Sequence, residues 1–139
     1  MEHDEFIGQV QHRAHLASRR DAERATRATL ETLAERIADG QAQNLAAQLP
    51  GEVGEHLRRQ APDEAGTGEQ FGLDELFERV TEREGINRPD AVFHARVVLE
   101  VVDEATTGGL LAKVREQLPQ EYERLFEAGS TGQMAGDRG

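Results

Sequence analysis

The sequence AAQLPGEVGEHL, residues 46–57, has a counterpart in REQLPQEYERLF, residues 115–126. Both contain Gln-Leu-Pro, a glutamate two positions after the proline, and apolar residues four and eight positions after the leucine. Proline lacks a backbone donor and disfavours a helical conformation in the residue before it, but neither property matters where a new helix begins. Each copy therefore predicts a corner between two helices. The side chains expected to face inward are Leu49, Val53 and Leu57 in the first copy, and Leu118, Tyr122 and Phe126 in the second.

The similarity extends well beyond these two corners. DEFIGQV, residues 4–10, matches DELFERV, residues 74–80, and DAERATRATLETLAER, residues 21–36, matches DAVFHARVVLEVVDEA, residues 90–105. Such self-similarity, in the same order along the chain, indicates a duplicated structural unit. We predict a first helical repeat at residues 1–58, a linker at 59–72, a second helical repeat at 73–128 and a disordered tail at 129–139.

The spacing of apolar residues predicts three to four helices in each repeat. The first helix is expected to begin at Asp4 or Asp74, since aspartate is a good N-cap residue. A long helix follows, from about residue 20 to 38 in the first repeat and from 90 to 106 in the second. The residues expected to be buried on these helices are Phe6, Ile7, Val10, Ala22, Thr26, Leu30, Leu33, Ile37, Leu76, Phe77 and Val80.

The long helix of the second repeat contains ARVVLEVV, residues 95–102, which β propensity alone would assign to a strand. The matching segment of the first repeat is rich in helix formers, and Pro89 suits the start of a helix, so we predict a helix in both repeats. Gly40 and Gly109 are expected to end the two long helices in a left-handed conformation. The two glycines of GEVGEHL, residues 51–57, favour a helix less than the matching residues of the second repeat do, so the sequence indicates this last helix less strongly in the first repeat.

One repeat alone would bury too small a fraction of its surface to be stable. We therefore expect an all-α domain of eight, or loosely six, helices, in which the two repeats pack through their long helices with approximate two-fold symmetry. The same contact could instead be made between two chains, in a swapped or a conventional dimer. Phe71, at the end of the linker, is expected to anchor this segment on the core.

Three stretches together resemble a known family. These are ATRATLETLAERIADGQAQNLAAQLP (residues 25–50), ARVVLEVVDEA (95–105) and REQLPQEYERLF (115–126). They resemble the uncharacterised prokaryotic proteins catalogued as domain of unknown function 2267, over about residues 4–128. The resemblance implies an all-helical, duplicated fold. It implies no activity, cofactor or catalytic residue.

The composition limits the possible partners. The chain of 139 residues has a net charge of -11, which repels phosphate backbones, so nucleic acid is an unlikely partner unless the arginines cluster on one face. The acidity is also compatible with adaptation to a high-salt cytoplasm. No apolar run is long enough to cross a membrane, and the acidic start MEHDEF does not fit a secretion signal, so we expect a cytoplasmic protein. The absence of cysteine excludes disulfides and thiolate chemistry.

Two histidines raise the question of a metal site. His12 and His15 are three positions apart on the first helix and could bind a transition metal together with His3 or a carboxylate. The second repeat has Glu82 and Gly85 at these positions. We therefore favour solvated histidines and predict no metal and no cofactor.

A charged pattern recurs on the two long helices. Arg27 and Glu31 match Arg96 and Glu100 in the second repeat, and both arginines are placed at the edge of the buried stripe. The simplest interpretation is a set of boundary salt bridges to acidic residues of the first helices. The acidic residues considered are Asp4, Glu5, Asp74 and Glu75. The alternative is a symmetric groove in which these arginines hold an acidic peptide or a small anion.

No sequence motif of a catalytic triad, a phosphate-binding loop, a dinucleotide fold or a zinc protease is present. We therefore expect a non-enzymatic protein that acts by protein–protein interaction or self-association. The alternative is binding of a small ligand or anion at the seam between the repeats. DNA binding by a helix-turn-helix-like unit stays possible, but the net acidity disfavours it.

Overall fold

The computed structural model describes residues 1–60 and 68–127, which form seven α-helices and one 3-10 helix and contain no strand. The predicted tail at 129–139 and residues 61–67, which are half of the predicted linker, lie outside the described residues. The all-α prediction is confirmed, and the valine-rich segment 95–102 is helical. The elements are α1 (His3–Arg13), α2 (Arg19–Arg36), α3 (Asp39–Gln48), α4 (Gly51–Gln60), α5 (Leu73–Glu84), α6 (Arg88–Ala105), α7 (Leu110–Gln117) and η1 (Gln120–Phe126).

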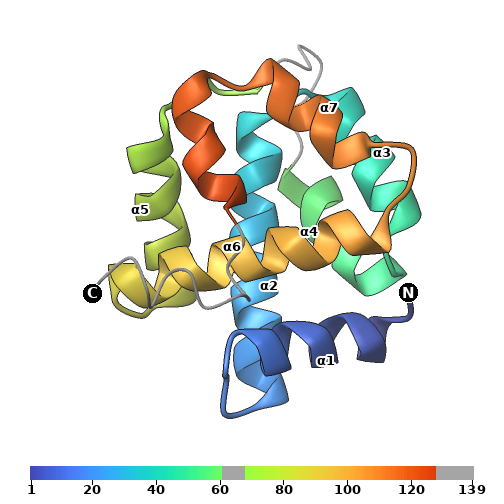
Figure 1. The fold of residues 1–139 in the computed structure, drawn as a ribbon, viewed down its shortest axis with the longest axis vertical. Helices are drawn as coiled ribbons and strands as arrows, with labels where there is room; N and C mark the ends of the chain where they lie inside the picture. The colour runs from blue at the N-terminus through green and yellow to red at the C-terminus, as the bar shows by residue number, and fades with distance from the viewer. Residues whose placement is uncertain (61–67, 128–139) are drawn as a thin grey trace.

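The two long helices, α2 and α6, cross at the centre of the molecule (Figure 1). We refer to residues 3–60 as the first half and to residues 73–126 as the second half. Helix α1 packs against α2 and also against α6, while α5 packs against α6 and also against α2. Helix α4 covers α2, η1 covers α6, and α3 contacts α7. Each half thus places its first helix on the long helix of the other half.

Both long helices are 18 residues long and begin with a side-chain cap. The side chains of Ser18 and Asn87, which are 69 positions apart, accept hydrogen bonds from the backbone N–H groups of Asp21 and Asp90, at 3.1 and 3.0 Å. The predicted stripe on α2 is buried throughout, as are the apolar residues predicted on α1 and α5. The valine-rich α6 is a helix because its own apolar side chains are buried in the core, which outweighs its β propensity.

The predicted starts of the first helices are wrong in detail. Asp4 and Asp74 are not N-caps but lie in the first turns of α1 and α5, neither of which has a side-chain cap. There each carboxylate meets the positive end of the helix dipole. Each also pairs with the arginine that opens the following long helix: Arg19 lies 2.7 Å from Asp4, and Arg88 lies 2.6 Å from Asp74.

The predicted glycine ends of the long helices are also wrong. Helix α2 ends because Ile37 turns to an extended conformation, with φ -100° and ψ 167°, and is buried. Gly40 instead lies in the first turn of α3. Gly109 does adopt a left-handed conformation, with φ 67°, but it precedes α7, and α6 has already ended at Ala105.

The helix corners at Pro50 and Pro119 are confirmed. Leu49 and Leu118, the residues before the prolines, are extended with ψ of 159° and 151°. The prolines precede the following helices rather than opening them. After Pro119 the chain forms a 3-10 helix, in which residues three apart share a face. Leu125 therefore joins Tyr122 in the core, while the predicted Phe126 is only partly buried.

Helix α4 forms despite its two glycines, and it is an α-helix while the matching segment η1 is a 3-10 helix. Gly54 is buried where α4 crosses α3. A Cβ atom at this position would lie 2.6 Å from the carbonyl oxygen of Ala46, closer than two such atoms can approach. Gly54 thus allows the two helices to pack backbone against backbone.

Two groups of ion pairs join the halves at the crossing. Arg13 on α1 lies 3.1 Å from Glu100 and 2.6 Å from Glu104, both on α6. Arg83 on α5 lies 2.6 Å from Glu35 on α2, which also lies 3.0 Å from Arg79. Although burial alone would raise the pKa of Glu35, the hydrogen bonds from Arg83 and Arg79 lower this pKa below its ordinary value of 4.5.

Phe71, two residues before α5, contacts both halves. Its ring is partly buried against the core, with the guanidinium of Arg79 at 4.0 Å from the ring centre. Its carbonyl oxygen accepts hydrogen bonds from Arg36 Nε, at 2.7 Å, and from the Tyr122 hydroxyl, at 2.8 Å. These bonds tie the end of α2 and the start of η1 to one backbone group.

We predict that Gly54→Ala destabilises the protein by about 1–3 kcal/mol, because the added methyl group forces α3 and α4 apart. The control is Gly40→Ala, where the new Cβ meets no atom within 4 Å. This control should be neutral or slightly stabilising, since alanine is the better helix former. Urea unfolding monitored by circular dichroism measures both. Equal stability of the two variants would contradict the close approach.

We predict that the free energy of unfolding falls as the pH drops below about 4.5, the ordinary pKa of glutamate. A carboxyl whose pKa is lowered in the folded state stabilises that state above its unfolded pKa and loses this effect on protonation. Glu35→Gln should lower the free energy of unfolding by about 1–3 kcal/mol at pH 7 and make it fall less steeply below pH 4.5. The exposed Glu78→Gln should leave the profile unchanged. If the free energy of unfolding of the wild type and of both variants fell equally steeply with decreasing pH, this role of Glu35 would be ruled out.

Candidate functional site

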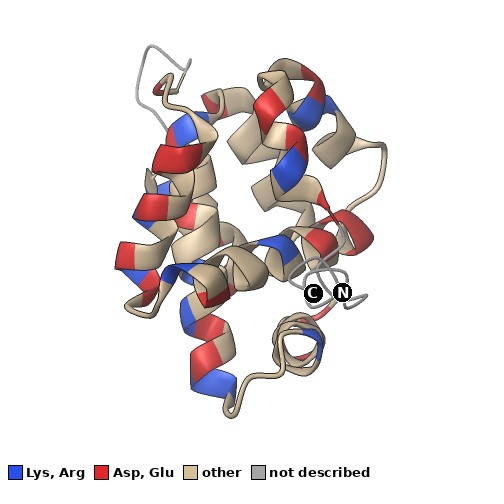
Figure 2. Cartoon of the chain, turned by 60° about the vertical axis from the view of Figure 1, so that its left-hand side comes forward, with Lys and Arg blue, Asp and Glu red and all other residues tan. Residues whose placement is uncertain are grey.

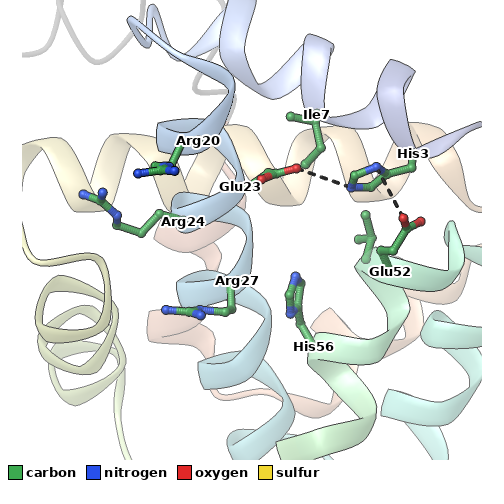
Figure 3. Close-up of a pocket in the computed structure, with 9 residues that line it drawn as sticks. His3, Ile7, Arg20, Glu23, Arg24, Arg27, Glu52 and His56 are labelled. Atoms are coloured by element: carbon green, nitrogen blue, oxygen red, sulfur yellow. Dashed lines mark ion pairs between the residues drawn. The ribbon is translucent and has the colours of Figure 1, made fainter.

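A groove of about 470 Å³ opens in the first half, between α1, α2 and α4. Its lining consists mainly of charged residues and histidines, together with two apolar residues (Figure 3). We call it the first-half groove. It is lined by His3, Ile7, Arg20, Glu23, Arg24, Arg27, Glu52, Val53 and His56.

The arginines of the groove all come from α2. Arg20, Arg24 and Arg27 follow one another at intervals of four and three residues, so they share one face of the helix. In Figure 3, Arg24 and Arg27 extend to one side of α2, while the histidines and Glu52 lie on the other side. One edge of the exposed face of α2 thus carries arginines, and the other edge lies next to the histidines and Glu52.

The groove arginines differ from most other arginines in having few partners. Arg13, Arg79, Arg83 and Arg88 each lie within 3.1 Å of a carboxylate oxygen. Within residues 1–60 and 68–127, neither Arg20 nor Arg27 makes a hydrogen bond or an ion pair. The closest carboxylate to Arg24 is that of Asp21, at 4.0 Å. Three guanidinium groups are therefore available to a ligand.

His3 links the three helices that form the groove. Its Nε2 atom lies 3.8 Å from Glu23 on α2, and its Nδ1 atom lies 3.9 Å from Glu52 on α4 (Figure 3). The two groove carboxylates thus lie next to a histidine rather than next to the arginines.

His56 is held in its neutral form near pH 7. Burial lowers its pKa below the ordinary value of 6.5, and the positive charges of Arg59 and Arg27 lower it further, while Glu31 opposes them. The Nδ1 atom of His56 lies 2.8 Å from Arg59 Nη2, from which it accepts a hydrogen bond. Neutral His56 can therefore donate its other ring N–H to a ligand without adding charge.

The four site residues proposed from the sequence do not meet in one groove. Arg27 is exposed in the first-half groove, and Glu31 pairs with Arg59 at 3.5 Å and with Arg83 at 3.7 Å. In the second half, Arg96 is buried, with its Nε donating to the carbonyl oxygen of Arg124, and Glu100 pairs with Arg13. The acidic partners expected for Arg27 and Arg96 are taken up elsewhere, since Asp4 binds Arg19 and Asp74 binds Arg88.

Several of the corresponding positions of the second half carry apolar side chains, whereas Arg27 and Glu52 correspond to Arg96 and Glu121. These positions lie 70 residues further along for α1 and 69 residues further for α2 and α4. Leu73, Tyr122 and Leu125 are buried there, and Val92 and Phe93 are partly buried. They take the places of His3, Val53, His56, Glu23 and Arg24, in that order. The same location is thus packed in one half and open in the other.

A second hollow, of about 390 Å³, lies between α3 and α7 and therefore between the two halves. This is the seam at which the sequence placed a possible ligand. Its charged lining consists of Lys113 and Glu116, which balance each other. Its other lining residues are Gln41, Asn44, Leu110, Val114 and Gln117.

Histidines elsewhere do not assemble a metal site. Among the residues that the structure describes, no group of three or more His, Asp and Glu side chains could hold a metal ion. His12 is exposed, and His15 adopts a left-handed conformation and stacks on Phe93. His94 is buried with its Nδ1 atom 2.5 Å from Glu84.

Residues 3–125 match the uncharacterised conserved proteins grouped as DUF2267. The chain belongs to this family. No curated protein is significantly similar to it. Within the described residues, no helix of this DUF2267 protein is long and apolar enough to cross a membrane. Since the family has no characterised activity, the function has to be argued from the groove itself.

We predict that His56→Leu raises the free energy of unfolding by about 1 kcal/mol, because it places leucine where the second half has Leu125 and removes a half-buried polar ring. His12→Leu, at an exposed position, is the matched control and should bring no such gain. Thermal or urea unfolding at pH 7 measures both. A less stable His56→Leu would mean that the imidazole is needed for packing rather than kept for a ligand.

Proposed function

We propose that this protein is a non-enzymatic binding protein that holds an anionic ligand, through its carboxylate or phosphate groups, in the first-half groove. The observation that carries the proposal is the row of Arg20, Arg24 and Arg27, which lacks close carboxylate partners in a protein of net charge -11. Arginines that serve only stability in so acidic a chain would be expected to find partners, as Arg13 and Arg83 do.

The distribution of charge supports this location. Residues 1–60 contain 10 acidic and 8 basic residues, whereas residues 68–127 contain 14 acidic and 7 basic residues. Both signs are spread over the helices (Figure 2). An anion therefore meets much less repulsion at the first half than at the second, and the groove arginines add attraction at short range.

The chemistry of the groove favours binding over catalysis. Guanidinium groups stay protonated at physiological pH, so they supply charge and hydrogen bonds but do not transfer protons. The two histidines of the groove, His3 and His56, lie beside Glu23, Glu52 and Arg59. This arrangement fits a site that holds a ligand by its charge.

Self-association through an apolar helix face has less support. Among the described residues, Met1 is the large hydrophobic residue that is exposed, with a relative accessible surface of 40%. Stable dimers generally bury a larger apolar patch. A protein–protein role is therefore better served by polar recognition at the first-half groove.

We also propose that the two halves descend from one duplicated unit and are related by an approximate two-fold axis. Three features support this: the equal lengths of α2 and α6, their side-chain caps 69 residues apart, and the exchange of first helices between the halves. In addition, Arg13 of the first half pairs with Glu104 on α6, and Arg83 of the second half pairs with Glu35 on α2.

We predict that citrate or inorganic phosphate binds the wild-type protein at low ionic strength and that Arg24→Gln/Arg27→Gln weakens binding about tenfold or more, since each lost charged hydrogen bond contributes about 1.5–3 kcal/mol. Isothermal titration calorimetry measures both effects. Absence of anion binding to the wild type at low salt would refute the proposal.

A further inference from the structure

The shape of the first-half groove restricts its ligand further. From Arg20 to Arg27 the groove follows seven residues of α2, which is about 10 Å at 1.5 Å per residue. A single phosphate or carboxylate group, about 5 Å across with its bound donors, reaches two of the three arginines at most. The full row therefore matches an elongated ligand with more than one anionic group.

An extended peptide has the required spacing. Side chains at alternate positions of an extended chain point the same way and are about 6.6–6.8 Å apart. The arginines of α2 are separated along the helix axis by about 6 Å and 4.5 Å, and their long side chains can adjust by the remaining difference. Acidic side chains at alternate positions would thus each meet a guanidinium group. The side chains between them would face the opposite way.

The other lining residues favour a peptide over a polyphosphate or a nucleic acid. Glu23 and Glu52 lie in the groove and repel any anionic ligand, but they accept hydrogen bonds from backbone N–H groups, which a peptide supplies and a phosphate chain does not. Ile7 and Val53 also line the groove, but each is only 1% exposed, so the contacts offered to a ligand are mainly polar.

We propose that the first-half groove binds an acidic segment of a partner protein, in an extended conformation and with carboxylates at alternate positions. This inference rests on the proposed anion-binding function and names its ligand class. It also fits the exposure of Arg20, Arg24 and Arg27, because peptides bind along exposed surface grooves whereas small molecules are enclosed on most sides.

The test uses the full-length protein and a fluorescein-labelled peptide of nine residues with glutamate at three alternate central positions. We expect this peptide to bind at low salt and to bind at least tenfold more weakly when its glutamates are replaced by glutamine. The triple variant R20Q/R24Q/R27Q should lose at least tenfold in affinity. The control R58Q/R115Q/R124Q carries the same change in net charge outside the groove and should stay within about threefold of the wild type.

The outcomes separate the inference from the function on which it rests. If citrate binds but the glutamate peptide does not, the peptide inference fails and the anion site stands; if neither binds, both fail. Equal peptide binding by both triple variants would place the peptide elsewhere and overturn the inference. Binding of single-stranded DNA as tight as that of the peptide would overturn it in favour of phosphate recognition. A charge-reversed R20E/R24E/R27E variant should reject the glutamate peptide and accept the same peptide with lysines.

Discussion

The fold depends on the crossing of α2 and α6, because neither long helix is covered by its own half alone. Helix α5 of the second half packs on α2, and α1 of the first half packs on α6. The apolar stripe of each long helix is therefore buried only when both halves are present. Arg13 and Arg83 border the crossing, where their ion pairs with the opposite long helix fix the orientation of α1 and α5.

Much of this architecture could be predicted from the sequence, because helix periodicity and the two Gln-Leu-Pro corners are local signals. The errors arose where tertiary contacts decide the local structure. Gly54 looked unfavourable for a helix, yet it is required by the approach of α4 to Ala46. Gly40 looked like a helix end, but Ile37 ends α2 earlier by turning into the core. The 3-10 form of η1, which exchanges Phe126 for Leu125, has no evident signal in the sequence.

The candidate site could be predicted only in part, because the criterion for site residues was similarity between the two predicted repeats. This criterion selected Arg27 and Arg96, of which one lies in the groove and the other is buried. It passed over Arg20 and Arg24, which have no charged counterpart in the second repeat. Their spacing with Arg27 on one helix face was visible in the sequence. That His3 completes the groove depends on how α1 folds back over α2, which no local pattern shows.

The packed counterpart of the groove, built from Leu73, Tyr122 and Leu125, has a consequence for how the protein can evolve. Under the proposed duplication, each location occurs twice, and one version packs the core while the other is free of that role. Substitutions among the exposed groove residues could then alter what the groove binds, in the function proposed for it, without dismantling the fold.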